Sequence, residues 1–345
     1  MGLLSRFPAL CAVVLLGSAC GGGGGGGNSD AAALPDGTIR ADASVIGDAA
    51  PPLPGRFLFC SSRTGNFELF RRDGGVDAQI TDDATQDAWW PRISPDRTKI
   101  VFYRSAVADR PATGGWDNNY EHATLWIMDA DGSDARPLLT LASQGWSAQG
   151  VANWSPDGQN LTMVARSASS GLWQLYIMDL EVGTPVEVSA RDAFYVDPSW
   201  SPIGDKLVYA AFPPGAKGID LAQLEVYVAN FNGTDELRLT TDTVRDHDPS
   251  WSPDGSLIVF ESEMDPAAFR WALRTISIPS GTVGTLIDDG NINTLGRFAP
   301  DGGLTFHRFI LGSGTDWRIS WIARDGSGLV DLTDGSHEDV DADPY

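Results

Sequence analysis

Short apolar segments rich in β-branched residues recur along the chain, most of them just after a turn built from proline, aspartate and glycine. They read KIVFY at 99–103, NLTMV at 160–164, KLVYA at 206–210, LIVFE at 257–261 and GLTFH at 303–307. Segments of this length and composition, bounded by turn residues, are typical of β-strands. The apolar spacing of a long amphipathic helix is absent after residue 20. The pattern therefore predicts an all-β protein.

Each apolar segment belongs to a longer repeat of four predicted strands. A first strand such as DPSW leads into the Ser-Pro-Asp-Gly turn, where proline fixes φ and Asp and Gly suit the later positions. The apolar strand follows, then a third strand such as EVYVAN and a fourth such as LRLT. The turns recur at intervals of 46 to 61 residues and begin at Ser94, Ser155, Ser201, Ser252 and Ala299. Four strands per repeat near this period predict a β-propeller.

One first-and-second-strand pair is missing from the count, and the two chain ends can supply it. The C-terminal segment DVDADPY at 339–345 matches RDHDPSW at 245–251 up to the residue before the tryptophan, which aligns Asp343 with Asp248. GRFLFCSSRTGNFELF at 55–70 matches a second strand running into a third. We expect the C-terminal strand to join the N-terminal blade and close the ring, which leaves no open edge. Residues 56–345 then form six four-stranded blades of about 48 residues each.

These repeats resemble those of a known family. The pattern P-x-W-S-P-D-G-x-x-I-x-F, followed by Y-x-M-D-x-D-G and R-L-T, is similar to the repeat of the TolB-like (WD40-like) propellers of the bacterial cell envelope. The resemblance covers residues 56–345. It implies a non-enzymatic protein that binds a protein or peptide partner at its channel face. TolB itself also carries an α/β domain before its propeller, where this chain has only a predicted linker.

The N-terminal residues predict secretion and a lipid anchor. Residues 1–19 have a basic residue, a short apolar run and small residues, as in a signal peptide, and the run is too short to cross a bilayer. LLGSAC resembles the lipobox of bacterial lipoproteins and makes Cys20 the predicted lipidation site, with ordinary cleavage nearby as the alternative. Residues 20–55 have the composition of a linker. We expect a monomer attached to the periplasmic or outer-membrane surface by lipid alone, with Cys60 as a small buried apolar residue.

The net charge of −22 and the pI of about 4.3 bear on the class of partner. An acidic surface repels phosphate backbones, so we predict no binding to nucleic acid. Metal ions, basic peptides and neutral glycans all stay open as ligands.

Two positions in each innermost strand, three and five residues before the repeated tryptophan, are expected to share one side because side chains alternate along a strand. We predict that they surround one mouth of the channel and form a ligand- or partner-binding site. Calcium held by Asp197, Asp248 and Asp343 is one form of this hypothesis. The alternative is that these aspartates cap turns and face solvent. The predicted site residues are Trp90, Tyr195, Asp197, Asp246, Asp248, Asp341 and Asp343.

Other motifs indicate structure rather than chemistry. Trp154, Trp200 and Trp251 are predicted to fill the space between blades, and the turn aspartates to form turns. The chain has no Gly-x-Ser-x-Gly elbow, and its four histidines lack zinc spacing. We therefore assign no catalytic residue. A carbohydrate-active or metal-dependent enzyme that uses the acidic mouth is the alternative.

Overall fold

The computed structural model describes residues 55–110, 119–216 and 220–345, and these residues form an all-β propeller, as the sequence predicts. The predicted signal peptide, Cys20 and nearly all of the predicted linker lie outside the described residues. The only helical elements in the described ranges are one short α-helix, α1 (Leu141–Gln144), and two 3₁₀ turns at Val107–Asp109 and Leu221–Gln223. None of the described helices has the length and apolar character needed to cross a membrane.

Four sheets contain four strands each, and all their strand pairs are antiparallel. The first has the order β24 (Asp339–Pro344), β1 (Arg56–Ser61), β2 (Glu68–Asp73) and β3 (Val76–Gln79). The second contains β4 (Gln86–Ile93), β5 (Lys99–Ala106), β6 (Thr124–Asp129) and β7 (Arg136–Thr140). The third contains β8 (Trp146–Trp154), β9 (Asn160–Ser167), β10 (Trp173–Asp179) and β11 (Pro185–Glu187). The fourth contains β12 (Tyr195–Trp200), β13 (Lys206–Ala211), β14 (Glu225–Asn230) and β15 (Leu237–Arg238).

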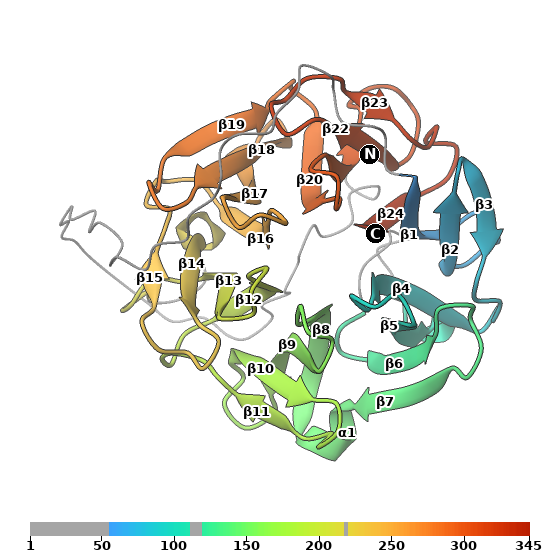
Figure 1. Cartoon of the computed structure of the whole chain (residues 1–345), viewed down its shortest axis with the longest axis horizontal. Helices are drawn as coiled ribbons and strands as arrows, with labels where there is room; N and C mark the ends of the chain where they lie inside the picture. Colours follow the sequence, from blue (N-terminus) through green and yellow to red (C-terminus); the bar gives the residue numbers. More distant parts are fainter. Residues whose placement is uncertain (1–54, 111–118, 217–219) are drawn as a thin grey trace.

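A fifth sheet has eight strands in two antiparallel halves, joined by one parallel pair between Trp271 and Ile292. The first half contains β16 (Asp246–Trp251), β17 (Leu257–Asp265), β18 (Arg270–Ser277) and β19 (Val283–Ile287). The second contains β20 (Ile292–Phe298), β21 (Leu304–Phe309), β22 (Arg318–Ile322) and β23 (Val330–Asp331). The sheets stand around a central axis, and the strands nearest to it are β4, β8, β12, β16, β20 and β24 (Figure 1).

The repeated turns form as the sequence predicts. The hydroxyl of Ser252 donates to Asp254 Oδ1 at 2.7 Å and accepts the backbone N–H of Leu257 at 2.9 Å. Gly255 follows with a φ of +69°, a conformation that glycine adopts without strain. The same serine-to-aspartate bond recurs at Asp96 and Asp157, so the predicted role of these aspartates in turns is confirmed.

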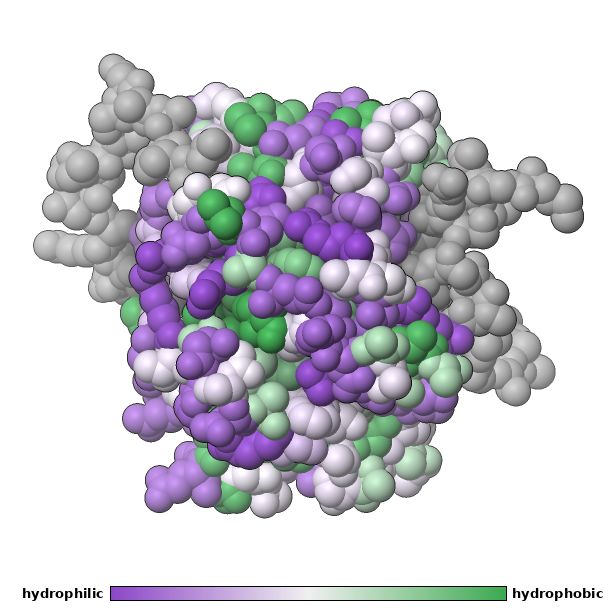
Figure 2. Space-filling view, turned by 90° about the vertical axis from the view of Figure 1, so that its right-hand side faces the viewer, coloured by the Kyte–Doolittle hydropathy of each residue, from purple (hydrophilic) through white to green (hydrophobic). Residues whose placement is uncertain are grey.

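The second strand of each sheet is buried on both faces because each sheet packs between two neighbours. In β5, for example, Ile100, Val101, Phe102 and Tyr103 are all fully buried. This explains why the strands are recognised as continuous apolar runs rather than by alternation. The outer side of the molecule near β2 and β3 is mostly hydrophilic, with apolar residues in small separate patches (Figure 2).

A β-bulge interrupts the innermost strand beside the axis in every sheet. One residue at each bulge has a positive φ, between 48° and 60°, although none of the six is glycine. Such a bulge breaks the alternation of side chains. The expectation that positions three and five before the tryptophan share one side is therefore wrong. The six residues are Trp90, Val151, Asp197, Asp248, Leu295 and Asp341.

The register of β24 also differs from the prediction. Ser61 pairs with Asp339 and Leu58 with Asp343, so Asp341 is the bulge residue and is equivalent to Asp248. The predicted alignment placed Asp343 there and was shifted by two residues. The predicted alignment matched the Asp-Pro pair at 343–344 to the pair at 248–249. Asp248 is itself a bulge residue, whereas Asp343 lies two residues after the bulge residue Asp341.

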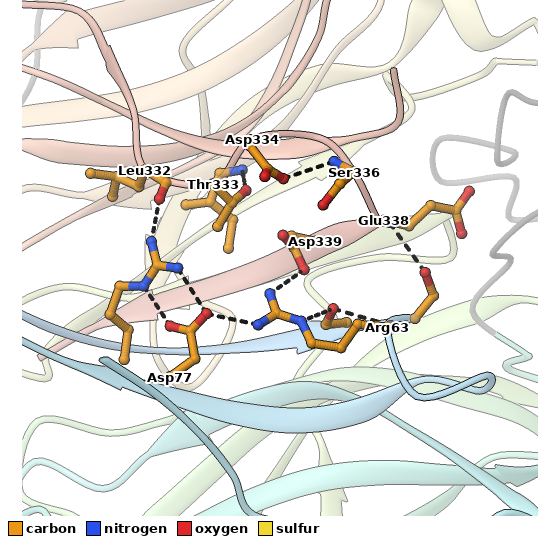
Figure 3. A network of polar contacts seen from close by, with 12 residues as sticks. Arg63, Asp77, Leu332, Thr333, Asp334, Ser336, Glu338 and Asp339 are labelled. Carbon is orange, nitrogen blue, oxygen red and sulfur yellow. Dashed lines mark hydrogen bonds and ion pairs between the residues drawn. The ribbon is translucent and has the colours of Figure 1, made fainter. Parts of the chain in front are cut away.

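Polar contacts connect β24 with the N-terminal part of its own sheet (Figure 3). Arg63 donates to Asp339 on β24 at 3.0 Å and to Asp77 on β3 at 2.7 Å. The backbone N–H of Glu338 donates to the Ser62 hydroxyl at 3.1 Å. Together with the pairing of β24 with β1, these contacts connect residues separated by about 280 positions in the chain.

Candidate functional site

Asp197 and Asp248 meet beside the axis, and His247 lies between them. The His247 Nδ1 atom is 2.9 Å from Asp248 Oδ2 and 3.5 Å from Asp197 Oδ2, and its Nε2 is 3.0 Å from Glu261 Oε1. All four side chains are at most 3% exposed. Burial by itself would lower the pKa of His247, but Glu261, Asp197 and Asp248 together raise it well above the ordinary value. No motif or spacing in the sequence would have placed His247 in this group.

Asp246 and Tyr195 do not join this group, although both were predicted to. Asp246 accepts a hydrogen bond from the Ser262 hydroxyl at 2.5 Å, and burial raises its pKa to about 6. The Tyr195 hydroxyl contacts the backbone N–H of Arg191 at 3.0 Å and Glu236 at 3.3 Å. Both residues are fully buried, and neither lines the cavity described below.

Asp341 and Trp90 lie together at the bulge level. Asp341 Oδ2 accepts the Trp90 backbone N–H at 3.0 Å and lies 3.4 Å from the sulfur of Cys60. Burial raises the pKa of Asp341 to about 6. Cys60 is a buried free thiol, so its prediction as a buried small residue is confirmed. The Trp90 indole is 1% exposed and donates to the carbonyl of Ala152 on the neighbouring sheet at 3.2 Å.

The predicted acidic mouth is therefore wrong in its geometry. Its carboxylates are largely buried and belong to separate groups. The predicted calcium ligands are not brought together, because Asp343 accepts the backbone N–H of Ile93 at 2.8 Å and interacts with arginines rather than with Asp197 and Asp248. In the described part of the chain, the groups with metal-like geometry are Asp197, His247 and Asp248, and Glu225, Asp242 and Asp246.

A cavity of about 340 Å³ lies at the other end of the innermost strands, where they run into the Ser-Pro turns. Each innermost strand contributes to it the residue two positions after its bulge residue. We call these six residues the floor ring, and they are Arg92, Asn153, Ser199, Ser250, Arg297 and Asp343.

Two arginines set the charge of the floor ring. Arg92 and Arg297 are 4% and 8% exposed, and both guanidinium groups lie against the Trp90 ring, at 4.2 and 5.7 Å from its centre. Arg92 Nε donates to Asn153 Oδ1 at 3.1 Å. Burial lowers the pKa of Arg92 to about 10; the charge of Asp343 opposes this shift, and the charge of Arg297 adds to it. Among the described residues, neither arginine has a carboxylate oxygen within 4.0 Å, although Asp343 lies in the same ring.

The cavity could have been found from the repeat itself. Trp154, Trp200 and Trp251, predicted only to fill space between blades, also line the cavity. The Trp154 indole N–H donates to the carbonyl of Arg92 at 3.0 Å and thereby connects two sheets. The residue before each tryptophan belongs to the floor ring, and reading that column across all repeats would have shown its two arginines.

Comparisons with known proteins agree with the fold. The family model described as TolB beta propeller domain matches residues 117–342. An uncharacterized protein of Agrobacterium fabrum is 36% identical over 115 residues, which are 32% of this chain and 36% of that protein. A TolB homolog of Chlorobium luteolum is 31% identical over 153 residues, 36% of this chain and 34% of that protein. The matched region thus spans about a third of the length of these curated relatives.

Solved structures give the same result. TolB from Acinetobacter baumannii has a TM-score of 0.65 at 17% identity, covering 85% of this chain and 67% of that one. An oligogalacturonate lyase from Vibrio parahaemolyticus has a TM-score of 0.53 at 12% identity, covering 80% and 74%. At these identities the likeness concerns the fold alone.

Proposed function

Because the chain belongs to the TolB β-propeller domain family, we propose that it is a non-enzymatic protein of the bacterial cell envelope that binds a protein or peptide partner. The partner docks at the channel face, in the cavity above the floor ring. The observation that carries this proposal is the cavity itself, which is open to a ligand, whereas the buried carboxylates at the strand starts are not. Ligands commonly bind in concave sites of this size.

The proposed architecture is a ring of six blades. The two antiparallel halves of the fifth sheet support this count, since only one residue pair joins them. The pairing of β24 with β1 supports closure of the ring through the C-terminal strand. A closed ring keeps the six floor-ring residues at fixed distances around one axis, which a rigid binding site requires.

We also propose that Cys20 is lipidated and holds the protein at the periplasmic or outer-membrane surface. The lipobox-like LLGSAC supports this. The full chain should then sediment with membranes, and Cys20→Ser should move it to the soluble fraction. Cys60→Ala, which removes the buried thiol, should leave it with membranes. Recovery of the unchanged chain in the soluble envelope fraction would contradict the anchor.

Photo-crosslinking tests the docking site directly. Tyr345 lines the cavity, and p-azidophenylalanine in its place keeps the aromatic ring and exchanges the hydroxyl for a small photoreactive azide. Irradiation in envelope extract of the native bacterium should give one discrete adduct, seen on a gel and identified by mass spectrometry. The same group at Val76, which is 70% exposed on the outer strand β3, is the matched control. Equal adducts from both positions, or none from Tyr345, would refute docking at the cavity.

The enzymatic alternative has weaker support. Asp197, His247 and Asp248 carry the types of group that catalysis uses, but each is at most 3% exposed and, unlike Arg92 and Arg297, none of them lines the cavity. A catalytic group must reach its substrate, and the likeness to a lyase concerns only the fold.

A further inference from the structure

We infer that the cavity is a receptor for carboxylate groups of an acidic peptide, with the guanidinium groups of Arg92 and Arg297 as the two binding groups. This rests on the proposed function and specifies the chemistry of the partner. It also differs from the metal ions, basic peptides and neutral glycans that the acidic composition left open as ligands.

The local charge of the cavity is opposite to that of the whole chain. Arg92, Arg97 and Arg297 line it, and Asp343 is its only acidic lining residue, whereas the whole chain carries a net charge of −22. At physiological ionic strength, exposed charges more than about 8 Å apart are largely screened. A carboxylate inside the cavity therefore interacts mainly with the charges of the lining, where three arginines outnumber the one aspartate, and little with the distant acidic surface.

The burial of Arg92 and Arg297 without an ion pair is unfavourable in the free protein. A buried charge is costly unless it is paired and hydrogen-bonded. Here both guanidiniums contact the same Trp90 ring, at 4.2 and 5.7 Å from its centre. Burial lowers the pKa of Arg92 and the charge of Arg297 adds to this, while the attraction of Asp343 opposes it without preventing the decrease. An incoming carboxylate would offset the repulsion between the two arginines and accept charge-assisted hydrogen bonds. Guanidinium groups suit this role because they bind carboxylates with two parallel N–H donors.

The remaining polar groups favour a peptide over an acidic glycan. The hydroxyls of Ser94 and Ser252 already donate to Asp96 and Asp254 in their turns. The Asn153 amide donates to the carbonyls of Val151 and Pro198. A sugar ring presents hydroxyl groups on every side and needs many free partners. The cavity lining instead presents the guanidinium groups of Arg92 and Arg297 among largely apolar side chains.

The apolar part of the cavity lining consists mainly of Trp154, Trp200 and Trp251 and of the prolines of the turns. Apolar side chains next to a carboxylate would bury surface there. A volume of about 340 Å³ holds only a few residues, at the low end of the ligand sites common in proteins. The expected ligand is a short acidic segment with apolar neighbours.

Direct binding to the purified full-length protein, solubilised in a neutral detergent, tests the inference. The probe is a fluorescein-labelled hexapeptide of alternating proline and glutamate, measured by fluorescence anisotropy at 150 mM salt. We expect it to bind at least about tenfold more tightly than the proline–glutamine hexapeptide, as one charge-assisted hydrogen bond would give. Arg92→Gln and Arg297→Gln should each lower the affinity for the glutamate peptide by about tenfold and leave the affinity for the glutamine peptide unchanged.

Arg136→Gln is the matched control, since Arg136 is exposed on β7, outside the cavity. It should bind the glutamate peptide like the unchanged protein. Thermal unfolding of every variant shows whether the fold is intact, and Arg92→Lys, which keeps the charge, replaces a glutamine variant that fails to fold. Equal affinity for the two peptides, or preference for trigalacturonate over the glutamate peptide, would overturn the inference. If the peptide fails while Tyr345 still captures an envelope protein, the proposed function stands and only its chemistry is wrong.

Discussion

Removal of residues 339–345 should lower the melting temperature of the protein by more than about 10 °C. The truncation deletes β24 and leaves β1 as an open edge beside the axis. Phe57, Leu58 and Cys60, which are fully buried, would then lose one covering strand. Full exposure of a large apolar side chain lowers the free energy of unfolding by about 1.5–3 kcal/mol. A loss of several kcal/mol corresponds to a shift of this size in a protein of this length.

The same truncation also removes specific contacts. Asp341 no longer accepts the N–H of Trp90, which is buried, and Asp343 no longer accepts that of Ile93, which is partly buried, so two donors of β4 lose their partners. Leaving a buried donor unsatisfied costs about 1–3 kcal/mol. Differential scanning calorimetry of the full and truncated propellers measures the effect.

Relocation of the strand provides the control. Tyr345 donates its backbone N–H to the carbonyl of Arg56 at 3.2 Å, so the end of β24 lies beside the start of β1. A permuted chain that begins at residue 339 and joins residue 345 to residue 55 through a short turn keeps the strand in place. It should recover most of the lost melting temperature. A truncated protein that melts like the full one would show that β24 does not close the fold.

His247→Gln should destabilise the protein by about 3–5 kcal/mol at pH 6, the range found when one partner of a buried ion pair is removed. The imidazolium lies within 3.5 Å of Asp197 and Asp248 and 3.0 Å from Glu261, all of them buried. Glutamine keeps a hydrogen-bonding amide but removes the positive charge. Three buried carboxylates then lack their shared cation. Urea denaturation of both proteins measures the difference.

The pH dependence gives a second test of the same group. The folded pKa of His247 is raised, so its stabilising contribution is complete below the unfolded value of about 6.5 and is lost as pH rises through the folded pKa. The destabilisation by His247→Gln should therefore shrink at high pH. The control is His122→Gln, because the His122 side chain is 52% exposed and lies 3.5 Å from Asp109. It should cost less than about 1 kcal/mol. A loss at His247 no larger than this, or one that grows with pH, would contradict the charged cluster.

The sequence by itself determined the strands, the turns and the repeat. Apolar runs such as 99–103 fall inside β5, and the Ser-Pro-Asp-Gly turns form with the predicted aspartate bonds. These features are local, because φ preferences, side-chain-to-backbone hydrogen bonds and burial on both faces act within a few residues. The period of the repeat then predicted a propeller.

Only the tertiary structure decided which residues face the axis. Trp90, Val151 and Leu295 have no local preference for a positive φ, yet each takes it where six strands converge. That conformation breaks the alternation on which the predicted acidic mouth depended. In β24 it falls on Asp341 and not on Asp343, so the predicted alignment of this strand was wrong by two residues. The charge of the cavity is likewise not a sum over the chain. Arg92 and Arg297 lie about 200 positions apart in the sequence, and they come together against Trp90 because the sheets surround one axis.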